Sequence, residues 1–151
     1  MKKQFAIATL GLALLLGGCA SPGVELGIKD AETTLNLAVY TSGTETPLSV
    51  HFFALESDDA FKKLDYFELM KKKESKLNGA IISQSKKILL PKDVERRSIK
   101  LDKNVHFYAV VAGFKDVDSN DNWRFIQKIT PESENTLTLI LSQDSIKKVN
   151  K

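Results

Sequence analysis

The sequence contains a single cysteine, Cys19, and only two histidines, His51 and His106. One cysteine cannot form a disulfide within the chain, so the folded domain must gain its stability from a buried core. Each histidine falls inside a predicted strand, where a lone histidine is more often structural than catalytic. The serines form no Gly-x-Ser-x-Gly elbow, and no glycine-rich phosphate loop is present. These absences argue against an enzyme, and we expect no catalytic residue and no cofactor.

The chain also lacks a hydrophobic run long enough to cross a membrane. The apolar stretch at residues 5–16 falls short of the roughly 20 residues that a spanning helix needs. Two lysines precede it and small residues follow it, which is the pattern of a secretion signal. The exit, Leu-Gly-Gly-Cys at 16–19, has the form of a lipobox, in which the cysteine thiol accepts a lipid. We therefore predict a lipoprotein signal peptide at 1–18 and lipidation of Cys19; the alternative is an ordinary signal peptide with an incidental cysteine.

Several expectations follow from a lipid on Cys19. Two or more acyl chains hold a protein on a membrane durably, whereas one holds it weakly. Ala20 stands where an aspartate would retain a lipoprotein at the inner membrane, so we expect the outer membrane, with the protein facing the periplasm. Residues 19–33 are then the acylated cysteine and a flexible tether.

The chain lacks a strong charge of either sign. Its net charge is +3, and removal of the two lysines in the signal peptide leaves about +1. A nearly neutral mature chain argues against nucleic acid as a partner. The 133 residues that remain after cleavage of residues 1–18 are enough for one domain with its own core.

The mature chain is rich in two-residue hydrophobic alternation. Residues Leu35 to Val39 show it clearly, which indicates a half-buried strand. Further strands are predicted at 48–55, 87–90, 96–101, 106–114, 123–129 and 136–141. The segment 106–114 is apolar on both faces, so we place it centrally in a sheet. Seven strands joined by short turns predict an all-β domain at 34–143, an antiparallel β-sandwich, followed by a polar C-terminal tail at 144–151.

One interval departs from this alternation. Apolar residues from Phe61 to Met70 recur at helical spacing, and Ser57 or Asp58 is suited to cap the start. We therefore predict a small helical insert near 57–73.

The acidic stretch Asp116–Asn122 places oxygen ligands at alternate positions, like the start of a calcium loop. Position six should be glycine but is Asp121, and position twelve should be glutamate but is Gln127. We interpret the stretch as a polar turn, because Asp and Asn favour turns. We expect no metal site, and a weak cation site is the alternative.

Three short motifs together resemble a known family. The strand Phe-Tyr-Ala-Val-Val-Ala-Gly-Phe-Lys-Asp at 107–116 is followed by Trp123-Arg124, with Lys115 where the family usually has arginine. Pro-Leu-Ser-Val at 47–50 opens a second matching strand. Phe61 with Asp-Tyr-Phe-Glu-Leu at 65–69 resembles a helical insert. The chain is similar to the outer-membrane lipoprotein of the type VI secretion system, the TssJ (SciN) family.

The resemblance implies a transthyretin-like β-sandwich with a small helical addition. It also implies a role as the outer-membrane anchor of an envelope-spanning complex. The partner would be the periplasmic C-terminal region of the inner-membrane protein TssM, which associates in turn with TssL. In the family, the contact is made largely by the loop between the first two strands. Here that loop is Tyr40, Thr41, Ser42, Gly43, Thr44, Glu45 and Thr46. A ligand-binding or inhibitory lipoprotein facing the periplasm, on the same fold, is the alternative function.

Overall fold

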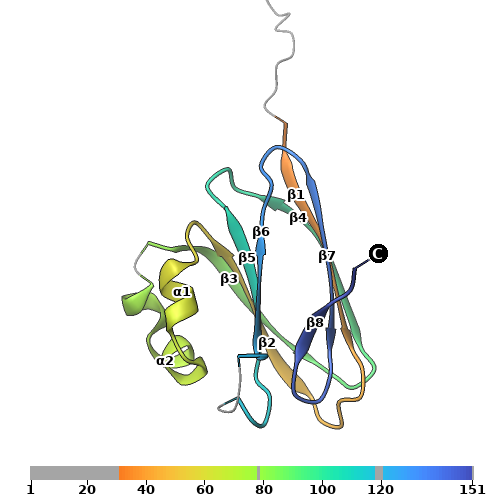
Figure 1. Cartoon of the computed structure of the whole chain (residues 1–151). Helices are drawn as coiled ribbons and strands as arrows, with labels where there is room; N and C mark the ends of the chain where they lie inside the picture. The colour runs from red at the N-terminus through yellow and green to blue at the C-terminus, as the bar shows by residue number, and fades with distance from the viewer. Residues whose placement is uncertain (1–30, 78, 118–120, 151) are drawn as a thin grey trace, which may run out of the picture. The chain divides into compact units, whose positions relative to one another are not determined.

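The computed structural model describes residues 31–77, 79–117 and 121–150. Within them the chain forms two four-stranded β-sheets and two short helices (Figure 1). The elements are β1 (Thr33–Thr41), β2 (Leu48–Leu55), α1 (Asp59–Lys63), α2 (Tyr66–Lys76), β3 (Ile81–Leu89), β4 (Val94–Leu101), β5 (Phe107–Ala112), β6 (Arg124–Lys128), β7 (Glu134–Leu141) and β8 (Ile146–Lys148). The all-β class with a small helical insert is therefore confirmed.

The strand order is β4-β1-β7-β8 in one sheet and β3-β2-β5-β6 in the other. All neighbouring strands run antiparallel except β1 and β7, which pair in parallel from Thr34 with Glu134 to Thr41 with Leu141. The sandwich is thus largely but not wholly antiparallel. As predicted, β5 lies inside its sheet, between β2 and β6.

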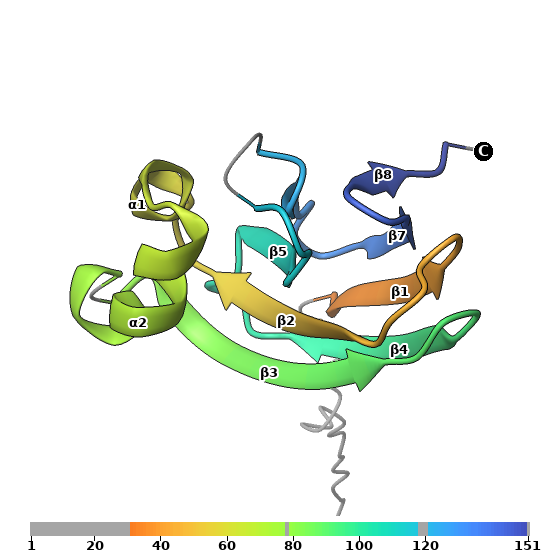
Figure 2. The ribbon, with the colours of Figure 1, turned by 90° about the horizontal axis from the view of Figure 1, so that it is seen from below.

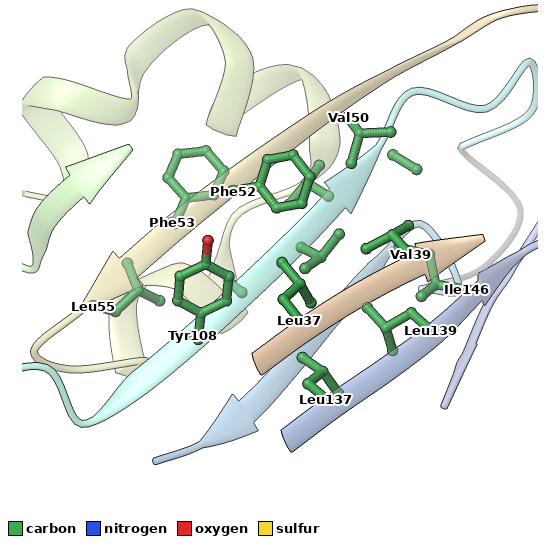
Figure 3. Packing of buried hydrophobic residues seen from close by; sticks show 14 of the residues in the cluster. Leu37, Val39, Val50, Phe52, Phe53, Leu55, Tyr108, Leu137, Leu139 and Ile146 are labelled. Atoms are coloured by element: carbon green, nitrogen blue, oxygen red, sulfur yellow. The ribbon is translucent and has the colours of Figure 1, made fainter. Parts of the chain in front are cut away.

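The main core lies between the two sheets (Figure 3). Every second side chain of β1, from Leu35 to Val39, is buried, and β7 contributes Leu137, Leu139 and Leu141 in the same way. This burial follows from the alternation in the sequence, since successive side chains of a strand point to opposite faces. Each buried aliphatic or aromatic side chain contributes about 1.5 to 3 kcal/mol, and this burial replaces the disulfides that the chain lacks.

A second apolar layer lies on the outer face of the sheet β3-β2-β5-β6. Figures 1 and 2 show α1 and α2 on the side of β2 and β3 away from β1 and β7. Phe53 of β2 contacts Phe61 of α1 edge-on, with ring centroids 5.2 Å apart, and both side chains are fully buried. Leu69 and Leu77 are buried with them. The second half of β2 is apolar on both faces, and the helical insert covers its outer face.

The insert contains two helices where the sequence predicted one over 57–73. α1 ends at Lys63, and α2 begins at Tyr66 after a short break. Asp65 and Glu68 form a reciprocal capping box: Glu68 N donates to Asp65 Oδ1 at 2.7 Å, and Asp65 N donates to Glu68 Oε2 at 3.2 Å. At the start of α1, Ser57 Oγ accepts a hydrogen bond from Asp59 N at 3.4 Å, and Asp58 makes no side-chain cap.

Two strands also differ from the sequence prediction. β3 begins at Ile81, well before the predicted start at Lys87, and most of its side chains are exposed. The segment predicted as a polar tail, 144–151, contributes β8, which pairs with β7 and buries Ile146. Both strands lie at sheet edges, where polar residues are tolerated and the hydrophobic pattern is weak.

The two ends of β1 lie at opposite ends of the sandwich. β1 starts at Thr33, to which residues 31 and 32 lead, and finishes at Thr41; nine strand residues span about 26 Å. Thr41 pairs with Leu141 at the end of β7, and Tyr40 pairs with Val94 at the start of β4. The β1–β2, β3–β4 and β7–β8 connections therefore gather at one end, which we call the loop rim.

No helix within the described ranges is long and apolar enough to span a bilayer.

Candidate partner-binding rim

The predicted contact loop, Tyr40 to Thr46, is only partly a loop. Tyr40 and Thr41 are the last two residues of β1, and the connection to β2 runs from Ser42 to Pro47. Within it only Thr44 is half-buried, and its neighbours are exposed. The accessible part of the predicted site is thus shorter than the sequence suggested.

Thr41 fastens the loop to the β3–β4 turn. Its Oγ1 donates to the carbonyl of Leu90 at 2.7 Å and accepts from the backbone N–H of Asp93, also at 2.7 Å. Its own backbone N–H donates to the carbonyl of Asp93 at 3.0 Å. Because Thr41 is buried and all these bonds are internal, this residue positions the rim and has no free group to offer a partner.

Tyr40 lies on the outer face of the sheet β4-β1-β7-β8. Its hydroxyl accepts a hydrogen bond from Nη2 of Arg96 at 2.9 Å, and the guanidinium carbon lies 5.4 Å from the centre of the ring. A cation stacked on an aromatic ring in this way contributes about 0.5 to 1 kcal/mol at an exposed site. Tyr40, the first residue of the predicted contact loop, therefore belongs to a Tyr40–Arg96 pair beside the loop.

The loop itself has few internal ties. Ser42 N donates to the carbonyl of Leu141 at 2.8 Å, which fixes the start of the loop against β7. Gly43 has φ +77°, a left-handed conformation that disfavours side chains, and open space surrounds the position where a Cβ would stand. The Oγ1 of Thr44 is buried and makes no hydrogen bond within the described part of the chain. Glycine is thus required at position 43 by backbone geometry.

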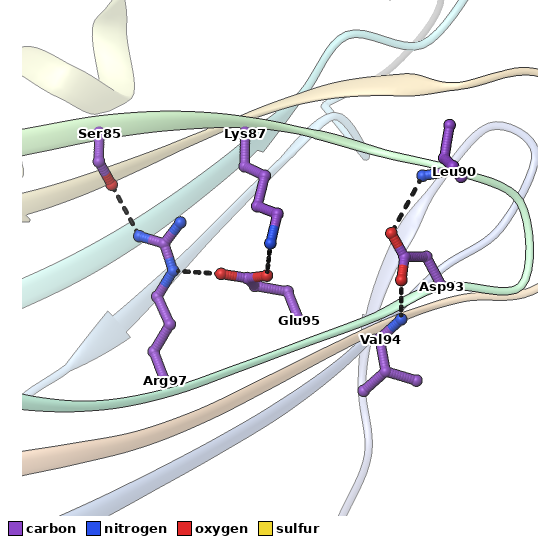
Figure 4. Close-up of polar contacts among 7 residues, drawn as sticks. All are labelled: Ser85, Lys87, Leu90, Asp93, Val94, Glu95 and Arg97. Carbon is purple, nitrogen blue, oxygen red and sulfur yellow. Dashed lines mark hydrogen bonds and ion pairs between the residues drawn. The ribbon is translucent and has the colours of Figure 1, made fainter.

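The β3–β4 turn, Leu90 to Asp93, stands beside this loop and was not singled out from the sequence. Asp93 holds it closed, since its carboxylate accepts from Leu90 N at 3.3 Å and from Val94 N at 2.9 Å (Figure 4). Lys92 has φ +63°, uncommon for a residue with a side chain. The signals were present: Pro91 favours the second position of a turn and Asp93 favours turns generally. The strand predicted at 87–90 ends just before Pro91, and no turn was predicted after it.

A buried carboxylate fixes the two strands that lead into this turn. Glu95 of β4 accepts a hydrogen bond from Nε of Arg97 at 2.8 Å and another from Nζ of Lys87 on β3 (Figure 4). Arg97 also donates to Ser85 Oγ at 2.8 Å and lies 4.0 Å from the centre of the Phe52 ring. Burial opposes ionisation of Glu95, but the hydrogen bonds and charges of Lys87 and Arg97 outweigh it and hold its pKa below the usual value.

A cavity of about 440 Å³ opens between the edges of β3 and β4, beyond this ion-pair group. Its walls include Phe52, Ile99 and Leu101, with Arg97 and Tyr108 as polar groups. Arg97 is already paired with Glu95, and burial raises the pKa of Tyr108 to about 12, against the opposing influence of the Arg97 charge. The hydroxyl of Tyr108 is therefore neutral at physiological pH, and the charge of Arg97 is already balanced.

The Trp123-Arg124 motif lies on the opposite side of the sheet from this cavity and supports the helical insert. Arg124 donates to three backbone carbonyls at the end of α1, those of Phe61, Lys62 and Leu64, at 2.7 to 2.9 Å. Its guanidinium stacks on Trp123, at 4.6 Å from the ring centre. These contacts give the motif a structural role.

Other residues considered in the sequence have simpler positions. His51 stacks on Phe53 at 6.3 Å, and His106, which precedes β5 and does not lie within it, has its Nδ1 3.1 Å from the carbonyl of Glu56.

Of the possible cation turn Asp116–Asn122, residues 118–120 lie outside the described residues. Asp121 lies 3.4 Å from Nη2 of Arg124. Across 31–77, 79–117 and 121–150, no three His, Cys, Asp or Glu side chains form a group that could hold a metal ion. Cys19 lies outside the described residues.

Comparison with solved structures identifies the fold. TssJ1, a type VI secretion lipoprotein from Pseudomonas aeruginosa, superposes with a TM-score of 0.74 at 23% identity, over 80% of this chain and 97% of that one. Lip from Serratia marcescens, a membrane-bound component of the type VI secretion system, gives 0.72 at 15% identity, over 79% and 98%. A chain in a structure titled type VI membrane complex gives 0.68 at 22% identity, over 78% and 98%.

Sequence comparison agrees with this result. No curated protein matches the chain. The T6SS-SciN family model, described as the type VI secretion lipoprotein and including VasD, EvfM and TssJ, matches residues 28–144. That range takes in every strand of the sandwich except β8, together with both helices. The chain therefore belongs to the type VI secretion lipoprotein family, a structural component of the secretion system and not an enzyme family.

Proposed function

We propose that this protein ties the membrane complex of a type VI secretion system to the outer membrane by binding the periplasmic region of TssM through the loop rim. The observation that carries the proposal is the course of β1. The strand begins at Thr33, to which the predicted tether leads, and ends at Thr41, where the rim begins. A domain held at one end thus presents the rim at the other, about 26 Å away.

The chemistry of the rim supports a protein contact. Ser42, Gly43 and Glu45 to Pro47 are exposed on a loop whose replacement leaves the two-sheet core intact. Tyr40 and Arg96, beside the loop, are the residue types that most often dominate protein interfaces. The rim therefore combines a rigid frame with exposed backbone and side-chain groups.

The names of similar structures support the choice of partner. One matching chain belongs to a structure titled the TssM C-terminal domain (869–1107) from EAEC, with a TM-score of 0.62 at 20% identity over 79% of this chain and 99% of that one. Another belongs to a structure titled type VI membrane complex. We infer that this chain assembles with TssM in the periplasm, with TssL joined indirectly, while acyl chains on Cys19 hold it on the outer membrane.

A loop variant tests the proposal. The variant carries Thr44→Val, Glu45→Lys and Thr46→Ala. It keeps Thr41 because this residue holds the β3–β4 turn, and Gly43 because of its left-handed backbone. We expect binding to the purified periplasmic region of TssM from the same organism to weaken about tenfold, or 1.4 kcal/mol, with the melting temperature unchanged.

The matched control carries Lys103→Ala and Lys128→Ala, two exposed positions outside the rim. This control is expected to bind like the wild type. Absence of binding by the wild-type protein would refute the proposed function. Wild-type affinity in the loop variant would remove the loop from the interface.

A further inference from the structure

Positive charge is concentrated on the segment that runs from β3 through the turn into β4. Between residues 81 and 106 the sequence has seven lysines and arginines against three acidic residues, a net charge of +4. The whole chain carries +3, so the remaining residues together carry −1. The cations are Lys86, Lys87, Lys92, Arg96, Arg97, Lys100 and Lys103. The segment from β3 to β4 therefore accounts for the basic character of the whole chain.

Exposed apolar side chains are concentrated on the same segment. Four large hydrophobic residues are exposed in the described part of the chain, and three of them flank the β3–β4 turn: Ile88 and Leu90 at 57% each, and Val94 at 40%. The fourth is Phe67 of α2, at 48%. Grouped exposed hydrophobics at one place typically mark an interaction site, whereas single ones need no explanation.

Cationic and apolar side chains lie side by side around the β3–β4 turn. Leu89 of β3 and Glu95 of β4 point inward and are buried, so their neighbours in sequence point outward. Ile88 therefore shares its outer face with Lys86, two residues away, and Val94 shares its own with Arg96. The turn between them adds Leu90 and Lys92. Each exposed apolar side chain thus has a cation beside it.

The turn is also held rigid. Asp93 closes the turn, Thr41 binds it to the end of β1, and Glu95 joins β3 to β4 through Lys87 and Arg97 (Figure 4). A surface fixed in advance loses little conformational entropy when a partner binds. These hydrogen bonds hold the backbone of the turn, and the exposed apolar side chains take no part in them.

We propose that the surface around the β3–β4 turn, called the tip below, with Ile88, Leu90, Val94, Lys86 and Lys92 as its contact residues, is a second docking surface beside the loop. It fits an acidic protein segment that carries apolar side chains. Charge complementarity selects the acidic partner, and the three apolar side chains require apolar groups opposite them. The identity of the partner as TssM rests on the proposed function.

Two other readings of a basic, apolar tip are less consistent with its position. Lysines on edge strands discourage pairing with other chains, but exposed isoleucine, leucine and valine do not serve that purpose. An anionic lipid surface also attracts cations and apolar groups. The tip, however, lies at the end of β1 opposite Thr33, from which the chain leads back towards Cys19. Figures 1 and 2 show the β3–β4 and β1–β2 connections next to each other at that end. The tip thus adjoins the loop that is proposed to bind a protein, which favours a protein partner.

The first test removes the apolar contacts. The mature chain with Cys19→Ser is compared with a variant that adds Ile88→Thr, Leu90→Ser and Val94→Thr, which keeps β-forming residues in both strands. We expect affinity for the periplasmic region of TssM to fall at least about tenfold, as for removal of a central apolar contact. Phe67→Ser is the matched control, since it deletes the other exposed hydrophobic residue, and it is expected to bind like the wild type. Melting temperatures are measured for all variants.

The second test removes the charge. Lys86→Glu with Lys92→Asn is expected to slow association while changing dissociation less, and the association rate of the unsubstituted tip is expected to fall as salt increases. Asparagine is chosen at position 92 because it tolerates the left-handed backbone found there. Lys128→Glu is the control for a change of charge elsewhere.

The outcomes separate the two proposals. If the loop variant loses TssM but both tip variants bind like the wild type, the tip is not a docking surface and the proposed function stands. If the unsubstituted protein does not bind TssM, the proposed function fails and the assignment of the tip to TssM fails with it. If the unsubstituted protein binds phosphatidylglycerol vesicles and the apolar tip variant does not, the tip is a lipid contact and the inference is overturned.

Discussion

Arg124 shows how one residue joins the insert to the sandwich. α1 has only five residues, too short to be stable alone, and its last carbonyls have no partners within the helix. The guanidinium of Arg124, on β6, supplies donors to three of them. Beside it, Tyr66 of α2 meets Trp123 edge-on at 5.5 Å, and a Cβ at Gly113 would stand 2.6 Å from the hydroxyl of Tyr66. The Trp123-Arg124 motif therefore holds the helical insert against the sandwich.

Replacing Arg124 tests this role. Arg124→Ala leaves three carbonyls without their donors, and we expect it to lower the free energy of unfolding by about 2 kcal/mol. Arg124→Lys retains the charge but not the planar fork, so an intermediate loss is expected. Urea unfolding measures both, with the exposed Lys128→Ala as control, for which the change should stay within about 0.5 kcal/mol. Equal stability of Arg124→Ala and the wild type would contradict the assigned role.

Glu95 predicts how stability depends on pH. Its pKa is lowered in the folded state, so its contribution is complete above the ordinary glutamate value of about 4.3 and is lost as the pH falls through the folded pKa. Glu95→Gln is expected to be less stable than the wild type at neutral pH by about 1 to 3 kcal/mol. The difference should shrink below about pH 4.

Urea unfolding at neutral and acidic pH checks this expectation for Glu95. The exposed loop residue Glu45 provides the control, because Glu45→Gln removes a carboxylate that makes no ion pair within the described residues and should not change stability at either pH. A stability difference between Glu95→Gln and the wild type that is the same at both pH values would exclude the ion-pair group as its source.

At the scale of elements, the hydrophobic pattern predicted the interior strands and missed what lies at the edges. β1, β2, β5 and β7 have strong apolar patterns because at least one face of each is buried. The first half of β3 and all of β8 are mainly polar at their exposed positions, so alternation alone could not reveal them. The break between α1 and α2 had a readable signal in the Asp65-x-x-Glu68 capping box, which was not used.

The candidate site was predicted only in outline for a related reason. The sequence marked the connection after β1, and residues 42–46 do lie in it. It could not show that Thr41 turns inward to bind Asp93, or that Tyr40 pairs with Arg96, because each contact joins residues about 50 positions apart. The β3–β4 turn came into view only when the fold placed it beside the loop.

β8 provides a prediction for the C-terminal segment. Ile146→Ala removes a side chain that is buried against the sandwich, and we expect a loss of about 2 kcal/mol or more in the free energy of unfolding. Lys147→Ala, at the next and exposed position of the strand, should change stability by less than about 0.5 kcal/mol. Urea unfolding of the two variants checks the prediction, and equal effects would mean that the segment behaves as a tail.

At the scale of the whole molecule, the observations behind the fold and family are separate from those behind the signal peptide and the lipid. The fold and the family rest on residues 28–144 and on the described strands. The cleavage site and the lipid rest on the N-terminal sequence pattern and stay predictions. Both are consistent with a family of lipoproteins, and the second is open to a direct experiment.

Cys19→Ser provides that experiment. We expect the variant to fold normally, because Cys19 lies before the sandwich domain, but to leave the membrane fraction. Fractionation of cells, with mass spectrometry of the wild-type N-terminus for acyl chains, measures both effects. Cys19→Ser protein that still sediments with outer membranes, or a wild-type protein without acyl chains, would refute lipid anchoring. Ala20→Ser, one position later, is the control and should stay in the membrane.

The course of β1 has a mechanical consequence. If the chain is pulled towards the membrane from Thr33 while a partner holds the rim near Thr41, tension runs along the length of this strand. β1 is hydrogen-bonded to β4 on one side and to β7 on the other, through eight residue pairs each. Where the partner also holds the β3–β4 turn, the load passes from β1 to β4 through these bonds, which lie across the strands and are sheared together, not unzipped one at a time. A lipoprotein built in this way is expected to resist a pull between its membrane anchor and its partner better than its modest size suggests.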